Sequence, residues 1–130
     1  MKVTLLYGGL LAILFIALSA RVIIGRMGPG SPSLGDGGNS VMFRRIRGHG
    51  NFAEYVPLAL VLIGFLELTG SPQWQLHTLG SVLLVGRILH GYALSFTDDN
   101  SFGRNAGIFA TLLVLSTSAV LCICRYFGGV

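Results

Sequence analysis

The sequence predicts an all-α protein, an integral membrane bundle of four helices, and three observations support this prediction. Hydrophobic residues make up 52% of the 130-residue chain and charged residues only 11%, against roughly 25% charged residues in ordinary soluble domains. Four apolar segments each reach the length of about 20 residues that crosses a bilayer. Turn-forming or polar clusters separate these segments. We expect one transmembrane domain over residues 1–130, with helices at about 3–25, 40–69, 72–96 and 104–126.

The first helix is predicted over residues 3–25. Residues 3–20 are 18 uncharged residues in a row, and after Arg21 three more apolar residues, 22–24, extend the segment. A cleaved signal peptide is the alternative, because Lys2 precedes an apolar stretch that reaches small residues. The length of the run favours a retained membrane helix. The glycine- and proline-rich segment 28–39 that follows is predicted to be a loop.

The second helix is predicted over residues 40–69 and the third over residues 72–96, because Gly70, Ser71 and Pro72 form a turn between them. Pro72 suits the first position of a helix. Glu67 lies close to the end of the second helix, and we expect it in a solvated position. The second helix is longer than a bilayer requires, so its first two turns are expected to reach the headgroup region. These turns carry three arginines: Arg44, Arg45 and Arg47.

The fourth helix is predicted over residues 104–126. It contains 20 consecutive uncharged residues, 105–124. Asp98 and Asp99 lie just before it, and we expect them to cap its N-terminus, where negative charge is favourable.

Composition and spacing argue against two classes of ligand. The net charge is +4, but the cations are scattered and no basic run is interleaved with aromatic residues, so we expect no nucleic-acid partner. Cys122 and Cys124 are two residues apart and point to different sides of a helix. Neither has histidine or carboxylate neighbours at ligand spacing, so we expect no metal site.

The distribution of arginines predicts the orientation of the chain in the membrane. Arginines gather at or near the first connection, and short loops rich in arginine and lysine stay in the cytoplasm. The first and third connections are therefore expected to be cytoplasmic, with both termini and the turn at residues 70–72 on the opposite side.

Polar residues within the second and third helices form the candidate site. Arg47, Asn51 and Glu54 follow a spacing of four and three residues, which places them on one stripe of a helix. Arg87 and His90 are three residues apart and share one face of the third helix. Ionisable groups inside a bilayer are costly unless they face protein or water. We therefore expect the two stripes to meet.

Three interpretations of these stripes are open. Arg47, Glu54 and Arg87 could pair with one another and hold the bundle together. The two arginines and one carboxylate could instead bind an anionic ligand that carries a free amine, because arginine suits bidentate carboxylate recognition. A small transporter or proton relay would use Glu54 and His90, although no helix is interrupted as in many transporters.

The segments 47–58 (RGHGNFAEYVPL) and 86–90 (GRILH) resemble the MAPEG family, the membrane-associated proteins in eicosanoid and glutathione metabolism. The four-helix layout and the chain length are similar to those of its small prokaryotic members. This resemblance implies a left-handed four-helix bundle that assembles as a homotrimer. It also implies that glutathione, as co-substrate, binds between neighbouring subunits.

The resemblance further implies a role for each residue of the site. Arg47 and Arg87 would meet the glutathione carboxylates or orient the site. Asn51 would hydrogen-bond the peptide, and Glu54 would take the γ-glutamyl amine. The other residues of the implied glutathione site are Arg26, Tyr55 and His90.

A catalytic role is expected for Arg104. A free thiol has a pKa of about 8.5, and a nearby arginine or a helix N-terminus lowers it. Arg104 combines both effects, and the thiolate-stabilising arginine of the family lies in this region; a membrane anchor is the alternative role. Leu94 departs from the family, since some eukaryotic relatives have tyrosine seven residues after the arginine that matches Arg87. This departure disfavours a eukaryotic eicosanoid substrate.

The sequence and the resemblance together predict a membrane-bound glutathione transferase or glutathione-dependent peroxidase. Its substrates would be hydrophobic electrophiles that arrive from the lipid, and its expected location is a bacterial inner membrane. The alternative function is that of a non-catalytic lipid-binding or scaffold protein on the same fold.

Overall fold

The chain folds into four long helices. The computed structural model describes residues 1–98 and 100–128, and its helices are α1 (Lys2–Gly25), α2 (Ser40–Leu68), α3 (Gln73–Phe96) and α4 (Ser101–Gly128). All four are long and apolar enough to cross a membrane. The predicted all-α membrane bundle is therefore confirmed.

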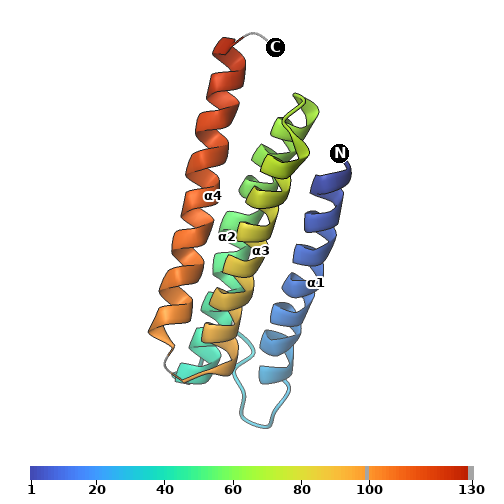
Figure 1. Ribbon diagram of the computed structural model, residues 1–130. Coiled ribbons are helices and arrows are strands. Elements are labelled where there is room, and N and C mark those ends of the chain that lie inside the picture. Colours follow the sequence, from blue (N-terminus) through green and yellow to red (C-terminus); the bar gives the residue numbers. More distant parts are fainter. Residues whose placement is uncertain (99, 129–130) are drawn as a thin grey trace.

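The helices are arranged around a central pair. In Figure 1, α2 and α3 lie between α1 and α4, and both outer helices contact the central pair. Within the described residues, α1 and α4 do not contact each other. The start of α1, the end of α4 and the α2–α3 turn lie at one end of the bundle, and the end of α1 and the start of α4 lie at the opposite end. The predicted topology is correct, whereas the side that faces the cytoplasm stays a prediction.

Each helix contributes to a single apolar core. Leu11, Ile63, Leu83 and Val114, one from each helix, are fully buried. Many large apolar side chains on the outer faces are exposed, including Ile13 and Phe109. Exposed apolar surface of this extent suits contact with lipid or with another subunit.

The start of α4 differs from the prediction. The helix begins at Ser101 instead of residue 104, because the side chain of Asn100 accepts a hydrogen bond from the Gly103 amide at 2.8 Å. Asp98 does not act as the predicted cap; its Oδ1 accepts from Arg44 Nη2 at 2.9 Å. Asp99, the other predicted cap, lies outside the described residues. The boundaries of the three preceding helices agree with the prediction to within one residue.

Glu67 caps α1 from the neighbouring helix, so the expected solvated position is wrong. Its carboxylate accepts hydrogen bonds from the amides of Val3 and Thr4 at 2.9 and 2.8 Å, and from Thr4 Oγ1 at 2.6 Å. The amino group of Met1 lies 3.7 Å from Glu67 Oε1. The first amides of a helix have no partner within the helix, and α1 has no side-chain cap of its own. Glu67 therefore satisfies donors that would otherwise be unpaired.

Glu67→Ala is expected to lower the free energy of unfolding by about 1 to 2 kcal/mol, the usual cost of a lost helix cap. The measurement is unfolding of the purified protein in mixed micelles with increasing sodium dodecyl sulfate. Leu68→Ala, a change at the exposed neighbouring residue, is the control and should change this free energy by less than about 0.5 kcal/mol. Equal stability of the Glu67 variant and the control would contradict the capping role.

Candidate functional site

Arg87 is the centre of a buried polar cluster that joins three helices. Its side chain is 1% exposed. Nη1 donates to Oδ1 of Asn51 on α2 at 2.7 Å, and Nη2 donates to the carbonyl oxygen of Gly107 on α4 at 3.1 Å. Thr111 Oγ1 donates to the same carbonyl at 2.9 Å. Both acceptors of the guanidinium are neutral, and within residues 1–98 and 100–128 no carboxylate pairs with its buried positive charge.

Glycines allow α3 and α4 to approach closely enough for these bonds. A Cβ atom on Gly107 would lie 2.5 Å from the carbonyl oxygen of Gly86 and 2.6 Å from the Cβ of His90. No real Cβ atom tolerates such distances. Glycine at position 107 is therefore what brings its own carbonyl within reach of Arg87.

His90 fixes the beginning of α4. The ring is 5% exposed, and its Nδ1 lies 3.2 Å from the carbonyl oxygen of Arg104. The Arg104 side chain itself is exposed. The backbone at the first turn of α4 is thus held against α3, while the guanidinium that we associate with the thiolate points outward.

The two predicted stripes meet only in part. Asn51 contacts Arg87, but Arg47 and Glu54 are exposed on the outer side of α2. At 3.6 residues per turn, Asn51 and Glu54 are about 60° apart around the helix axis, which is enough for one to face the core and the other to face outward. Within residues 1–98 and 100–128, no ion pair joins Arg47, Glu54 and Arg87. Their mutual pairing, one of the three interpretations, is not seen.

The remaining predicted residues lie in the same half of the bundle. Tyr55 is half-buried on α2. Arg26 follows the end of α1, and its Nη1 donates to the carbonyl oxygen of Ser33 in the first connection at 2.6 Å. Arg26 is therefore held by its own loop and is not brought to Arg87 within one chain.

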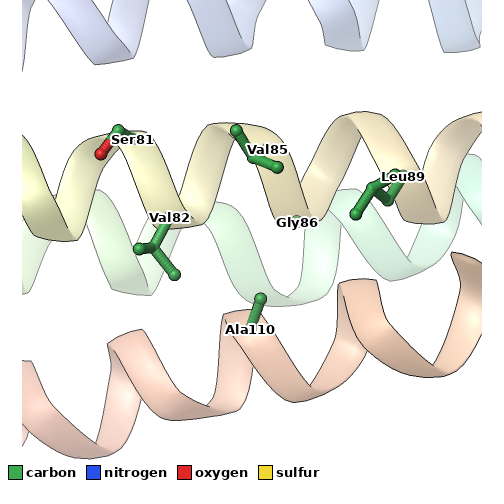
Figure 2. Close-up of a pocket in the computed structure, with 6 residues that line it drawn as sticks. All are labelled: Ser81, Val82, Val85, Gly86, Leu89 and Ala110. Carbon is green, nitrogen blue, oxygen red and sulfur yellow. The ribbon is translucent and has the colours of Figure 1, made fainter.

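An apolar groove follows the seam between α3 and α4 beside this cluster. It has a volume of about 250 Å³. Figure 2 shows Val85 and Leu89 on α3 on one side and Ala110 on α4 on the other, with Gly86 between them. Gly86 precedes Arg87 in the chain, so the groove and the polar cluster share one stretch of α3. A hydrophobic molecule could thus lie close to the charged site.

Sequence reasoning missed the contribution of α4 to this cluster. Gly107 and Thr111 were not singled out, although Gly103, Gly107 and Thr111 recur every four residues along α4. All three are buried. Small residues at four-residue spacing are typical of a close helix–helix contact inside a membrane, and this signal could have identified the face of α4 that meets α3.

Comparison with known proteins covers nearly the whole chain. The MAPEG family model matches residues 4–124. The chain is 43% identical over 113 residues to the "Inner membrane protein YecN" of Escherichia coli K12, which covers 87% of this chain and 84% of that protein. A protein of the same name from Escherichia coli O6:H1 matches with the same identity and coverage. The name of these relatives states a location and no activity.

Proposed function

This chain belongs to the MAPEG family, and from that premise we propose that it is a membrane enzyme that binds glutathione and works as a homotrimer. The observation that carries the proposal is the exposure of Arg47 and Glu54 on the same helix as half-buried Asn51, which binds the buried Arg87. The protein is an integral membrane protein with four spanning helices. A bacterial inner membrane is the location that we propose.

Exposed charges on a spanning helix favour a site between subunits. Arg47 and Glu54 lie on the outer side of α2 and have no ion-pair partner among the described residues. Charged groups within a membrane normally face protein or water. A neighbouring subunit and a ligand with carboxylates and a free amine would together supply the missing partners. Glutathione has both groups, and Arg26 of the adjacent subunit is our candidate to complete its site.

The chemistry that we propose begins with the glutathione thiol. The Arg104 guanidinium and the N-terminus of α4 would favour loss of the thiol proton to water. The sulfur of the thiolate then attacks an electrophilic carbon, forms a carbon–sulfur bond and expels a leaving group such as chloride. With a hydroperoxide, the sulfur instead takes the terminal oxygen and releases an alcohol, and a second glutathione then gives the disulfide and water.

The apolar groove supports a hydrophobic second substrate. Its lining of Val82, Val85 and Leu89 suits an alkyl or aryl group that enters from the lipid. A non-catalytic lipid-binding protein on the same fold would also use such a groove. Turnover separates these two functions.

Arg47→Ala and Glu54→Gln are each expected to weaken glutathione binding roughly tenfold, the cost of one charge-assisted contact. The measurement is isothermal calorimetry on the detergent-purified protein, with chromatography to check its oligomeric state. Arg125→Ala, at the other end of the bundle, is the matched control and should bind as the unchanged chain does. Unchanged affinity in both site variants would overturn the glutathione assignment.

Arg104→Ala is expected to lower conjugation of glutathione to 1-chloro-2,4-dinitrobenzene roughly tenfold at neutral pH, because less thiolate forms. The deficit should shrink as the pH rises toward the ordinary thiol pKa of about 8.5. The control is Asn105→Ala, a change at the adjacent exposed residue. A deficit that does not depend on pH would refute thiolate stabilisation by Arg104, and binding without turnover in the unchanged chain would favour the lipid-binding function.

A further inference from the structure

A second polar pocket lies between α1, α2 and α3 at the end of the bundle that carries the first and third connections. It has a volume of about 210 Å³. Its arginines come from two helices: Arg21 near the end of α1, and Arg44 and Arg45 in the second turn of α2. Ser95 and Phe96, at the end of α3, close its third side. None of these arginines belongs to the proposed glutathione site.

The pocket carries an excess of positive charge. Arg44 Nη2 lies 2.9 Å from Asp98 Oδ1, but the Asp98 side chain is 99% exposed, so this ion pair is open to solvent at the rim. The Arg21 guanidinium donates to the Ser95 carbonyl oxygen at 2.8 Å and lies 4.4 Å above the centre of the Phe96 ring. Arg45 has no hydrogen-bond or ion-pair partner within residues 1–98 and 100–128. Among the residues that the structure describes, three arginines and one exposed carboxylate line this pocket.

Several polar atoms of the pocket residues are buried and unpaired. The Ser95 side chain is 5% exposed, and its Oγ has no hydrogen-bond partner within the described part of the chain. The same holds for the Nε atoms of Arg21, Arg44 and Arg45. Buried polar groups in folded proteins are nearly always satisfied. A phosphate group brings several strong acceptors, and arginine is well suited to its geometry.

The depth and the rim of the pocket favour a lipid as the source of the phosphate. Arg21 lies four residues before the end of α1, about 6 Å from it along the axis, a level that corresponds to the headgroups in a spanning bundle. Val41 and Phe96 also line the pocket, and both are exposed. An apolar rim next to a basic pocket fits acyl chains attached to an anionic headgroup. A soluble phosphate would gain nothing from that rim.

We propose that the pocket of Arg21, Arg44, Arg45 and Ser95 binds the phosphate headgroup of an anionic phospholipid. The lipid joins the end of α1 to the α2–α3 pair, where no carboxylate among residues 1–98 and 100–128 pairs with Arg45. This binding does not require glutathione, so the outcome is independent of the enzymatic activity.

The test is native mass spectrometry of the full chain, released from detergent with phosphatidylglycerol or with phosphatidylcholine of the same acyl chains. Retention of phosphatidylglycerol is expected to exceed that of phosphatidylcholine roughly tenfold. Arg45→Gln is expected to remove most of this preference, and Arg21→Gln should do the same. Arg125→Gln, an arginine at the opposite end of the bundle, is the matched control and keeps the preference.

Three results would overturn the proposal. They are equal retention of the two lipids, an undiminished preference in Arg45→Gln, and displacement of phosphatidylglycerol by inorganic phosphate at equal concentration, which would identify a soluble anion as the ligand. Arg45 has no hydrogen-bond or ion-pair partner in the described chain, so its replacement removes no partner from any other described group. If Arg21→Gln does not fold because the Ser95 carbonyl loses its donor, the Arg45 variant still decides the outcome.

Discussion

Arg87→Met is expected to abolish detectable glutathione binding, a loss of at least roughly 100-fold, without lowering the stability of the protein. The guanidinium is 1% exposed and contacts two neutral acceptors, Asn51 Oδ1 and the Gly107 carbonyl. A buried charge without a counter-charge is costly, and an apolar side chain of similar size is often neutral or stabilising in its place. The same change removes the group that orients Asn51 and supplies positive charge to the site. Calorimetry measures the binding, and unfolding in mixed micelles measures the stability.

Arg87→Ala separates the effect of charge from that of volume. It removes the same charge and also leaves a cavity, so it is expected to lower the free energy of unfolding by about 3 kcal/mol. If the methionine and alanine variants were equally destabilised, the hydrogen bonds of the guanidinium would contribute more to stability than its burial costs. If the methionine variant still bound glutathione, Arg87 would have no part in the site.

The pairing of Arg87 with Asn51 illustrates what the sequence could predict. Both side chains are polar residues at helical spacing within apolar segments, and such groups must find partners inside the bundle. The outward direction of Arg47 and Glu54 could not be predicted in the same way. A difference of about 60° around α2 decides which residue of the stripe faces the core, and periodicity alone does not resolve it.

Contacts to the backbone explain most of what the sequence did not predict. The partners of Glu67 are amides of α1 more than 60 residues away. Every residue except proline has a backbone amide, so the sequence does not indicate which amides Glu67 will bind. For the same reason, the sequence does not indicate that the Gly107 carbonyl accepts a hydrogen bond from Arg87. At the start of α4, Asp98 and Asn100 are both suitable caps by residue type. The tertiary contact with Arg44 occupies Asp98 and leaves the cap to Asn100.

The two ends of the bundle differ in whether their charged side chains find partners within the chain. Glu67 and the amides that it caps are paired within one chain, whereas Arg47 and Glu54 have no ion-pair partner in the part of the chain that the structure describes. Natural proteins depart from full internal satisfaction mainly where function requires it. The end of the bundle with the exposed charges Arg47 and Glu54 is therefore where we expect the ligand and the neighbouring subunit, whereas substitution of Glu67 is expected to act through stability alone.

Gly107→Ala tests the contact on which the buried cluster depends, and it is expected to lower the free energy of unfolding by about 3 kcal/mol, the upper part of the range for overpacking. The new Cβ would lie 2.5 Å from the Gly86 carbonyl oxygen and 2.8 Å from the His90 backbone nitrogen. Backbone atoms in two packed helices cannot move away as a side-chain end can, so α3 and α4 must separate. Separation lengthens the bonds from Arg87 to the Gly107 carbonyl and from His90 to the Arg104 carbonyl, so glutathione binding should weaken as well.

Gly8→Ala is the matched control for this change. Gly8 is also a helical glycine, but no atom lies within 4 Å of the Cβ that it would gain. Alanine at such a position is expected to raise stability by about 0.5 to 1 kcal/mol through helix propensity. The two variants add the same methyl group and should therefore shift the unfolding midpoint in opposite directions. A Gly107 variant as stable as the unchanged chain would mean that α3 and α4 are not held at this distance, and the geometry of the Arg87 cluster would then lose its physical basis.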